Sequence, residues 1–158
     1  MTLPRIILVA TDFSEDADRA LAQAAELAAQ LDATIHLVHA VSIPALGVPE
    51  LGLAYAATTM ESRTVDAQVA LDALVARYCD RVSMAPVRIE IGDARDVIDR
   101  VAELIGADLI VMGTHGRRGV RRMLLGSIAE SVVRSAPCPV LTVRAKQHRP
   151  ASTAQETL

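Results

Sequence analysis

Hydrophobic and polar positions divide this chain into short apolar runs rich in β-branched residues and longer stretches with apolar residues at helical spacing. The run at 6–10 is the first predicted strand, and the alanine-rich stretch that ends at Leu31 is the first predicted helix. Ser14 is expected to cap this helix, because acidic residues follow in the first turn, where the helix dipole favours them. Its core-facing side is predicted to contain Ala17, Ala20, Leu21, Ala24, Leu27, Ala28 and Leu31.

The rest of the chain continues the alternation of strands and helices. Further strands are predicted at 34–41, 87–91, 109–112 and 139–144, and further helices at 55–81, 94–104 and 127–135. The long helix at 55–81 is expected to place Leu71, Leu74, Val75 and Tyr78 on its inner side. Prolines and glycines predict a loop at 42–54. Asp93 can cap the next helix, and Gly106 follows its end. Apolar residues alternate with Arg88 and Glu90 in the third strand, which indicates an exposed edge.

This alternation predicts an α/β domain with a parallel sheet and helices on both of its faces. The length fits a single domain at 1–146, with a polar tail at 147–158 that is predicted to be disordered. Ligands bind such sheets beyond the carboxyl ends of the strands, where the strand order reverses. If the first and fourth strands are neighbours there, Asp12 and Gly113 flank one crevice.

The segment after the fourth strand reads Gly113-Thr-His-Gly116, then nine residues, then Gly126-Ser127. Glycines allow backbone N–H groups to approach an anion, and a helix N-terminus favours negative charge. The segment also contains Arg117, Arg118, Arg121 and Arg122, whose guanidinium groups match phosphate oxygens. We therefore expect it to hold a polyphosphate. A P-loop is excluded because no lysine lies near Gly126, and the turn after the first strand lacks the glycines of a dinucleotide fingerprint.

Composition narrows the choice of partners. The net charge is −3 and aromatic residues make up 2% of the chain, which argues against nucleic acid and anionic membranes as ligands. No stretch has the layout of a signal peptide or the length of a membrane span, so a cytoplasmic protein is expected. Cys79 and Cys138 have no metal-ligand spacing, and both are interpreted as inert core thiols.

The glycine spacing, the Thr11-Asp-Phe-Ser14 turn and the closing Pro137-Cys-Pro-Val-Leu-Thr-Val143 together resemble the universal stress protein family over about residues 4 to 145. The resemblance implies a Rossmann-like, five-stranded parallel sheet in the order 3-2-1-4-5. It also implies an ATP-binding site, because the glycine pattern is similar to the family's ATP-binding signature.

Transferred position by position, the resemblance places Asp12 on the ribose hydroxyls. The adenine would lie against backbone near Ala10, Thr11 and Ala40, with Met112 beside it. Contacts to the ribose and phosphates are implied for Gly113, Gly116, Gly126, Ser127 and Ile128. Among the arginines, Arg117 is favoured for phosphate contact because it directly follows Gly116.

Each of these roles has a structural alternative. Asp12 can be a turn residue that accepts from its own backbone. Ser127 with Glu130 can form a capping box, which would occupy the serine hydroxyl. The arginines can be solvated, and His115 is interpreted as a solvated loop histidine.

The resulting hypothesis is an ATP-binding stress-response module with at most slow hydrolysis, in which ATP could bring Mg²⁺ with it. A nucleotide-dependent hydrolase or adenylyl-transferring enzyme remains an alternative, as does a nucleotide-free module that binds a client protein. A homodimer is expected through the last strand, Val140 to Arg144, because a sheet edge invites pairing and the family commonly pairs there.

Overall fold

The computed structural model describes residues 3–42, 49–116 and 125–144, with side chains omitted from 49–58. Its strands are β1 (Ile6–Ala10), β2 (Thr34–Val41), β3 (Ser83–Met84), β4 (Arg88–Ile91), β5 (Leu109–Gly113) and β6 (Val140–Val143). Its helices are α1 (Glu15–Leu31), α2 (Pro49–Tyr78), α3 (Ala94–Ile105) and α4 (Ser127–Ser135). The predicted tail at 147–158 and Arg117 lie outside the described residues.

All strand pairs in the described sheet are parallel, and the order is β3-β2-β1-β5-β6, with β4 also paired to β2. This confirms the predicted α/β class and the order of the strands. The count is six rather than five because two short strands, β3 and β4, share the third position along β2. Pro86 lies between them and has no N–H to donate, so the ladder is interrupted there.

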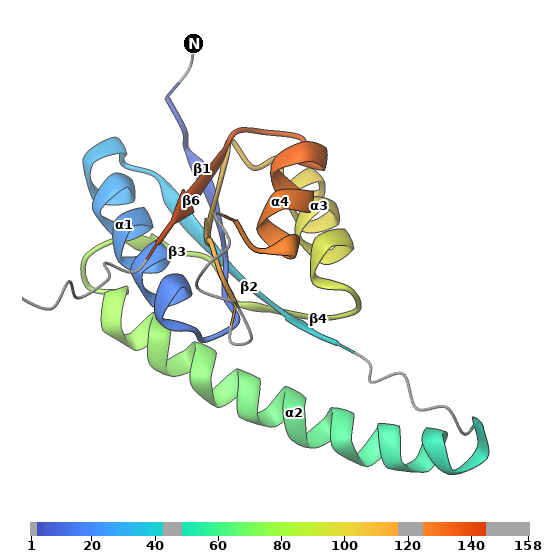
Figure 1. Ribbon diagram of the computed structural model, residues 1–158. Helices are drawn as coiled ribbons and strands as arrows, with labels where there is room; N and C mark the ends of the chain where they lie inside the picture. The colour runs from blue at the N-terminus through green and yellow to red at the C-terminus, as the bar shows by residue number, and fades with distance from the viewer. Residues whose placement is uncertain (1–2, 43–48, 117–124, 145–158) are drawn as a thin grey trace, which may run out of the picture.

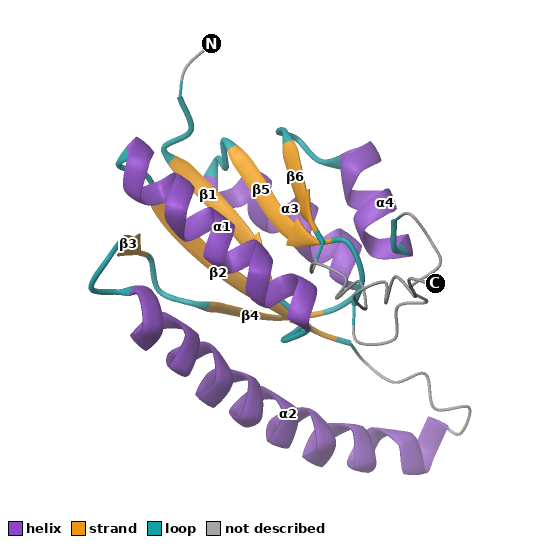
Figure 2. Cartoon of the chain, turned by 60° about the vertical axis from the view of Figure 1, so that its left-hand side comes forward, coloured by secondary structure: helices purple, strands orange, loops and turns teal. Residues whose placement is uncertain are grey.

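Helices cover both faces of the sheet. Figures 1 and 2 show α1 and α2 on one side and α3 and α4 on the other. One core cluster joins Ile7, Val9 and Val111 to the inner residues of α1 and α2. The second joins Leu8 and Ile110 to α3 and α4. Alternate residues of β1 and β5 therefore enter different cores, as expected for strands buried on both faces.

The first helix forms as predicted. The Ser14 side chain accepts a hydrogen bond from the N–H of Ala17 at 3.3 Å, and the helix ends at Asp32 in a left-handed conformation. Five alanines of this helix are buried (Ala17, Ala20, Ala24, Ala25 and Ala28). The predicted caps of α3 are also present, with Asp93 at the start and Gly106, at φ 62°, at the end.

The long helix α2 differs from its prediction at both ends. It begins at Pro49, so the prediction of a loop is wrong for 49–54, and it ends at Tyr78 rather than Arg81. Proline is compatible with the first helical position, where its missing N–H would have had no partner in the helix. At the other end, the N–H groups of Arg81 and Val82 both donate to the Tyr78 carbonyl, and this tight turn brings Val82 into the core. The inner side is confirmed for Leu71, Leu74 and Tyr78.

The two cysteines have different environments. Cys79 is exposed, so its interpretation as a core thiol is wrong, because the turn that buries Val82 leaves Cys79 on the outside. Cys138 is half-buried against the second cluster, and burial raises the pKa of its thiol. The described residues contain no group of His, Cys, Asp and Glu side chains that could hold a metal ion.

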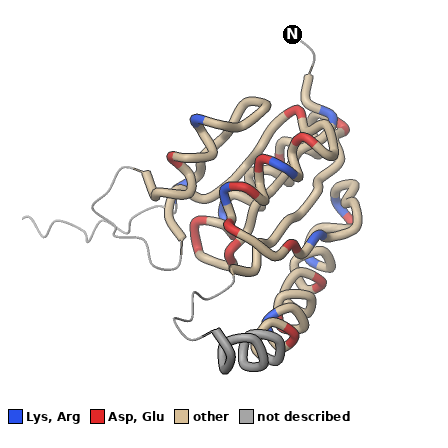
Figure 3. The backbone as a smooth tube through the Cα atoms, turned by 90° about the vertical axis from the view of Figure 1, so that its right-hand side faces the viewer, with Lys and Arg blue, Asp and Glu red and all other residues tan. Residues whose placement is uncertain are grey.

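Basic and acidic residues are interspersed along the described part of the backbone (Figure 3). Exposed ion pairs join several of them, such as Arg134 with Glu130 at 2.7 Å and Arg100 with Glu90 at 3.2 Å. Pairs of this kind contribute little to stability individually. Within the described ranges, no helix is both long enough and apolar enough to cross a membrane.

Asp108 ties the start of β5 to the start of β1, and this contact predicts an acid-sensitive loss of stability. Its carboxylate accepts from the N–H groups of Arg5 at 2.8 Å and Ile6 at 2.9 Å, and these bonds lower the pKa of Asp108. A lowered folded-state pKa gives stability that is present above the ordinary value of 3.8 and lost as the pH falls below it. We expect Asp108→Ala to lower the thermal midpoint at pH 7, and we expect the difference from the wild type to shrink only as the pH falls below 3.8. Asp66→Ala, at an exposed position on α2, is the control; a difference that is constant with pH would contradict the prediction.

Candidate functional site

Two loops meet at the carboxyl ends of β1 and β5, because these strands are neighbours with Ala10 opposite Met112. Asp12 follows one strand and Gly113 ends the other, and both line a cavity of about 470 Å³. The predicted crevice at this end of the sheet is therefore present.

Ten of the eleven predicted site residues line this cavity. They are Ala10, Thr11, Asp12, Ala40, Met112, Gly113, Gly116, Gly126, Ser127 and Ile128. Further walls come from Val38 on β2 and from Ala94 and Ile98 on α3. Sequence reasoning missed the two α3 residues. Their helical spacing predicted α3 itself, but gave no indication that its first turns reach the switch point.

Hydrogen bonds to β2 and within the turn itself hold the turn that follows β1. The Thr11 N–H donates to the Val38 carbonyl at 3.0 Å, and the Phe13 N–H donates to Thr11 Oγ1 at 3.1 Å. Asp12 Oδ1 accepts from the Ser14 N–H at 3.1 Å, which is the turn role considered as an alternative for this residue. The same carboxylate lines the cavity, so the turn bond fixes where it lies relative to a ligand.

A histidine and an aromatic ring support this turn. His39 Nδ1 lies 2.8 Å from the Thr11 carbonyl oxygen, and the Phe13 ring lies 4.6 Å from the His39 ring. Phe13 has φ 62°, a left-handed conformation that is uncommon for a bulky residue. These contacts hold the chain in that conformation and give His39, near the end of β2, a role in supporting the turn.

The glycines of the signature lie against the protein's own atoms. A Cβ at Gly113 would come within 2.8 Å of Asp16 Cβ and 2.9 Å of the Ala17 nitrogen, in the first turn of α1. At Gly126 it would lie 2.8 Å from the Thr114 carbonyl oxygen. At Gly116 it would lie 2.7 Å from Asp12 Oδ2. The absence of side chains thus allows three segments to close together around the cavity.

The start of α4 corrects one interpretation of the sequence. Gly126, not Ser127, occupies the N-cap position, and no side chain of the described residues caps the helix. The capping box considered as an alternative for Ser127 does not form, because Ser127 lies one position past the cap, and Glu130 pairs with Arg134 one turn further on. Ser127 is the first helical residue, exposed at the rim of the cavity. The first amide groups of α4 have no partner within the helix and point out of its N-terminus, where an anion is favoured.

Two serines at helix starts provide a matched pair of variants. Ser14→Ala removes a cap bond and is expected to lower the free energy of unfolding by about 1 kcal/mol. Ser127→Ala removes no cap, so we expect a change within about 0.5 kcal/mol. Urea denaturation of both variants measures the difference. Equal losses would show that Ser127 does cap α4 in solution.

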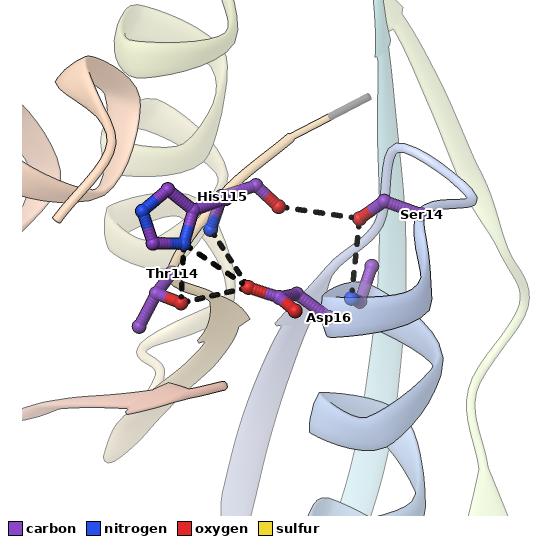
Figure 4. A network of polar contacts seen from close by, with 5 residues as sticks. Ser14, Asp16, Thr114 and His115 are labelled. Carbon is purple, nitrogen blue, oxygen red and sulfur yellow. Dashed lines mark hydrogen bonds and ion pairs between the residues drawn. The ribbon is translucent and has the colours of Figure 1, made fainter. Parts of the chain in front are cut away.

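His115 is not the solvated residue that its loop position suggested. Its side chain is 12% exposed and lies 3.4 Å from Asp16 Oδ2 through Nδ1. The same Asp16 oxygen accepts from Thr114 Oγ1 at 2.7 Å and from the His115 N–H at 3.1 Å. Figure 4 shows these side chains turned toward one another between the start of α1 and the end of β5. Asp16 had been interpreted only as an acidic residue in the first helical turn, because the contact spans 99 positions of sequence.

Comparisons with known proteins agree with this geometry. The family model described as the universal stress protein family matches residues 4–144. Universal stress protein A homolog 2 of Coxiella burnetii is 33% identical over 141 residues, which cover 89% of this chain and 94% of that protein.

Solved structures give the same result. UspA from Lactobacillus plantarum superposes with a TM-score of 0.81 at 25% identity, covering 88% of this chain and 97% of that one. A universal stress family protein from Burkholderia pseudomallei is 36% identical with a TM-score of 0.66, covering 92% of this chain and 99% of that one.

Proposed function

Because this chain belongs to the universal stress protein family, we propose that it binds ATP in the cavity at the carboxyl ends of β1 and β5 and acts as a stress-response module. The observation that carries the proposal is the composition of the cavity. Ten of the residues at which the family resemblance places nucleotide contacts line a single space of about 470 Å³, which is within the size range of small-molecule sites.

The chemistry around the cavity suits the parts of a nucleotide. Small and apolar side chains from β2, β5 and α3 offer a surface for a base, namely Val38, Ala40, Ala94, Ile98 and Met112. The Asp12 carboxylate can accept from both hydroxyls of a ribose. The N-terminus of α4, with Gly126 as its cap, favours phosphate through its amide groups and its dipole.

Two proteins of the same fold were determined with adenine nucleotides. One is a universal stress protein in complex with cAMP, and the other is an Arabidopsis thaliana family member with AMP bound. At 22% and 21% identity they show the fold alone, so the choice of ATP rests on this chain's own glycine spacing and helix terminus.

We assign at most slow hydrolysis to the site. Phosphoryl transfer needs a positioned nucleophile or water together with charge stabilisation. His115 Nδ1 faces Asp16 and Thr114, so this nitrogen is not directed at a substrate. Mg²⁺ would arrive with the phosphates and take most of its ligands from them and from water.

The decisive experiment is to denature the purified protein and identify any released nucleotide by chromatography and mass spectrometry. ATP or ADP near one per chain is the expected result. Calorimetric titration of nucleotide-free protein with ATP and Mg²⁺ provides the second measurement. No released nucleotide together with no heat of binding would refute the proposal.

For assembly, we propose a cytoplasmic homodimer joined through β6. In the described sheet this strand pairs with β5 alone, and Leu141 on it is exposed. An exposed strand edge offers backbone groups to a second copy. Sedimentation at micromolar concentration is expected to give a dimer, and Leu141→Lys is expected to shift it toward monomer. A wild-type monomer would contradict the proposal.

A further inference from the structure

We propose that Asp16 is a positioning residue whose carboxylate holds the segment from Gly113 to Gly116 against α1, and that nucleotide affinity depends on it. The inference rests on the proposed nucleotide site and adds a residue that does not itself line the cavity. Three observations carry it, concerning the carboxylate, the threonine that it binds and the absence of space at Gly113.

The carboxylate is largely enclosed and receives several donors. The Asp16 side chain is 13% exposed, and one of its oxygens accepts from the Thr114 hydroxyl at 2.7 Å and from the His115 N–H at 3.1 Å. His115 Nδ1 lies 3.4 Å from the same oxygen and 3.0 Å from the Thr114 hydroxyl. Hydrogen bonds to an ionised, poorly solvated acceptor are stronger than neutral ones. Asp16 therefore fixes two successive residues of the loop from one point on α1.

Thr114 connects this constraint to β6 and to the start of α4. Its N–H donates to the Val143 carbonyl of β6 at 2.9 Å, and its carbonyl accepts from the Gly126 N–H at 2.8 Å. Gly126 is the cap of α4, so the hydroxyl bond to Asp16 and the bond that places the α4 N-terminus belong to the same residue. The position of the α4 N-terminus relative to α1 is therefore set through Thr114.

The close contact at Gly113 limits how far the loop from Gly113 to Gly116 can move relative to α1. Asp16 Cβ and the backbone of Ala17 occupy the space that a side chain at Gly113 would need. Ser14 Oγ adds a further link to the His115 carbonyl at 3.4 Å. The loop therefore rests directly on the first turn of α1, and the Asp16 bonds determine how it is oriented there.

The test compares Asp16→Ala with Asp18→Ala, which removes an equal charge from an exposed position of the same helical turn. With ATP and Mg²⁺ as the probe, calorimetry is expected to show affinity reduced about tenfold or more for Asp16→Ala, and near wild type for Asp18→Ala. The Asp16→Ala substitution should reduce the affinity for adenosine less than the affinity for ATP, because in the proposed binding mode the loop and α4 contact the phosphates. Equal losses in the two variants, or an unchanged affinity in Asp16→Ala, would overturn the proposal.

A second pair covers the case in which Asp16→Ala does not fold. Thr114→Val removes the hydroxyl at constant size and should reproduce the loss, whereas Thr114→Ser keeps the hydroxyl and should restore binding. A purely steric role for Thr114 predicts the reverse order and would contradict the assignment.

Amide hydrogen exchange without nucleotide separates this inference from the proposed function. Asp16→Ala is expected to speed exchange at the His115 and Gly126 amides, while Asp18→Ala leaves both unchanged. If the wild type binds no nucleotide, the proposed function fails. In that case faster exchange still supports the positioning of the loop, and unchanged exchange overturns it.

Discussion

Gly113→Ala is expected to lower the free energy of unfolding by about 3 kcal/mol, the upper part of the usual range for overpacking. The added Cβ would lie 2.8 Å from Asp16 Cβ and 2.9 Å from the Asp16 carbonyl carbon and the Ala17 nitrogen. Two of these atoms are helical backbone, so relief requires β5 and α1 to separate. Denaturant unfolding monitored by circular dichroism measures the change.

Gly116→Ala is the matched comparison within the same motif. Its Cβ would meet Asp12 Oδ2 at 2.7 Å, the end of a side chain that can rotate. We expect a loss of stability within about 1 kcal/mol, together with weaker nucleotide binding because Asp12 is displaced. Similar losses of stability in the two variants would show that the glycine contacts do not differ as described.

The second large effect is expected at Asp12. Asp12→Ala should weaken ATP binding by about 1.5–3 kcal/mol, or about tenfold to a hundredfold, because hydrogen bonds to a charged acceptor are lost. The variant also loses the acceptor for the Ser14 N–H. Its thermal midpoint must therefore be compared with that of Asp12→Asn, which can keep that turn bond.

A change in the ligand isolates the ribose contact from the turn. The wild type is expected to bind ATP more tightly than 2′-deoxy-ATP, and Asp12→Ala is expected to bind the two equally. This thermodynamic cycle combines one substitution in the protein with one change in the ligand. An effect of Asp12→Ala on the rest of the fold cancels, because it is the same for both ligands. Unchanged discrimination in Asp12→Ala would place the carboxylate away from the ribose.

The sequence was sufficient to predict helices and strands wherever several local signals agree. β1, β2 and α4 have the predicted bounds, because apolar runs and flanking turn residues coincide there, and α1 follows the Ser14 cap. The strand order came with the family resemblance and is confirmed by the pairing. The alternation that indicated an edge at 87–91 is also confirmed, since β4 pairs with β2 in the described sheet.

The predictions from sequence fail where contacts between distant segments determine the local structure. β3 consists of two residues, too few to give a periodic signal, and it forms because Ser83 and Met84 lie opposite β2. Cys79 was assigned to the core by its residue type alone, although the turn after α2 places it outside. A four-residue pattern offered Ser127 as the cap of α4, but Ser127 is the first helical residue and Gly126 is the cap.

The candidate site likewise contains residues that the sequence predicted and a contact that it did not. The strand–helix alternation and the family resemblance together predicted that the glycines and Asp12 meet at one crevice, and all of these residues line it. The bond between Asp16 and His115 connects positions 99 apart, so no local pattern could have indicated it. The role of each lining residue toward a nucleotide stays a prediction until binding is measured.

Alanines occupy much of the inner face of α1, and each of them adds only one methyl group between the helix backbone and the sheet. Ala20, Ala24 and Ala28 are buried along this face, and α1 packs chiefly over β5. They act as spacers that set the height of the helix above the sheet, and the contact at Gly113 requires that height to be small. A bulkier residue at Ala24, two turns from the loop, would lift the whole helix and draw Asp16 away from Thr114. The width of the crevice therefore depends on core residues along the whole length of α1. Substitutions of these residues, far from the cavity itself, are expected to change its shape.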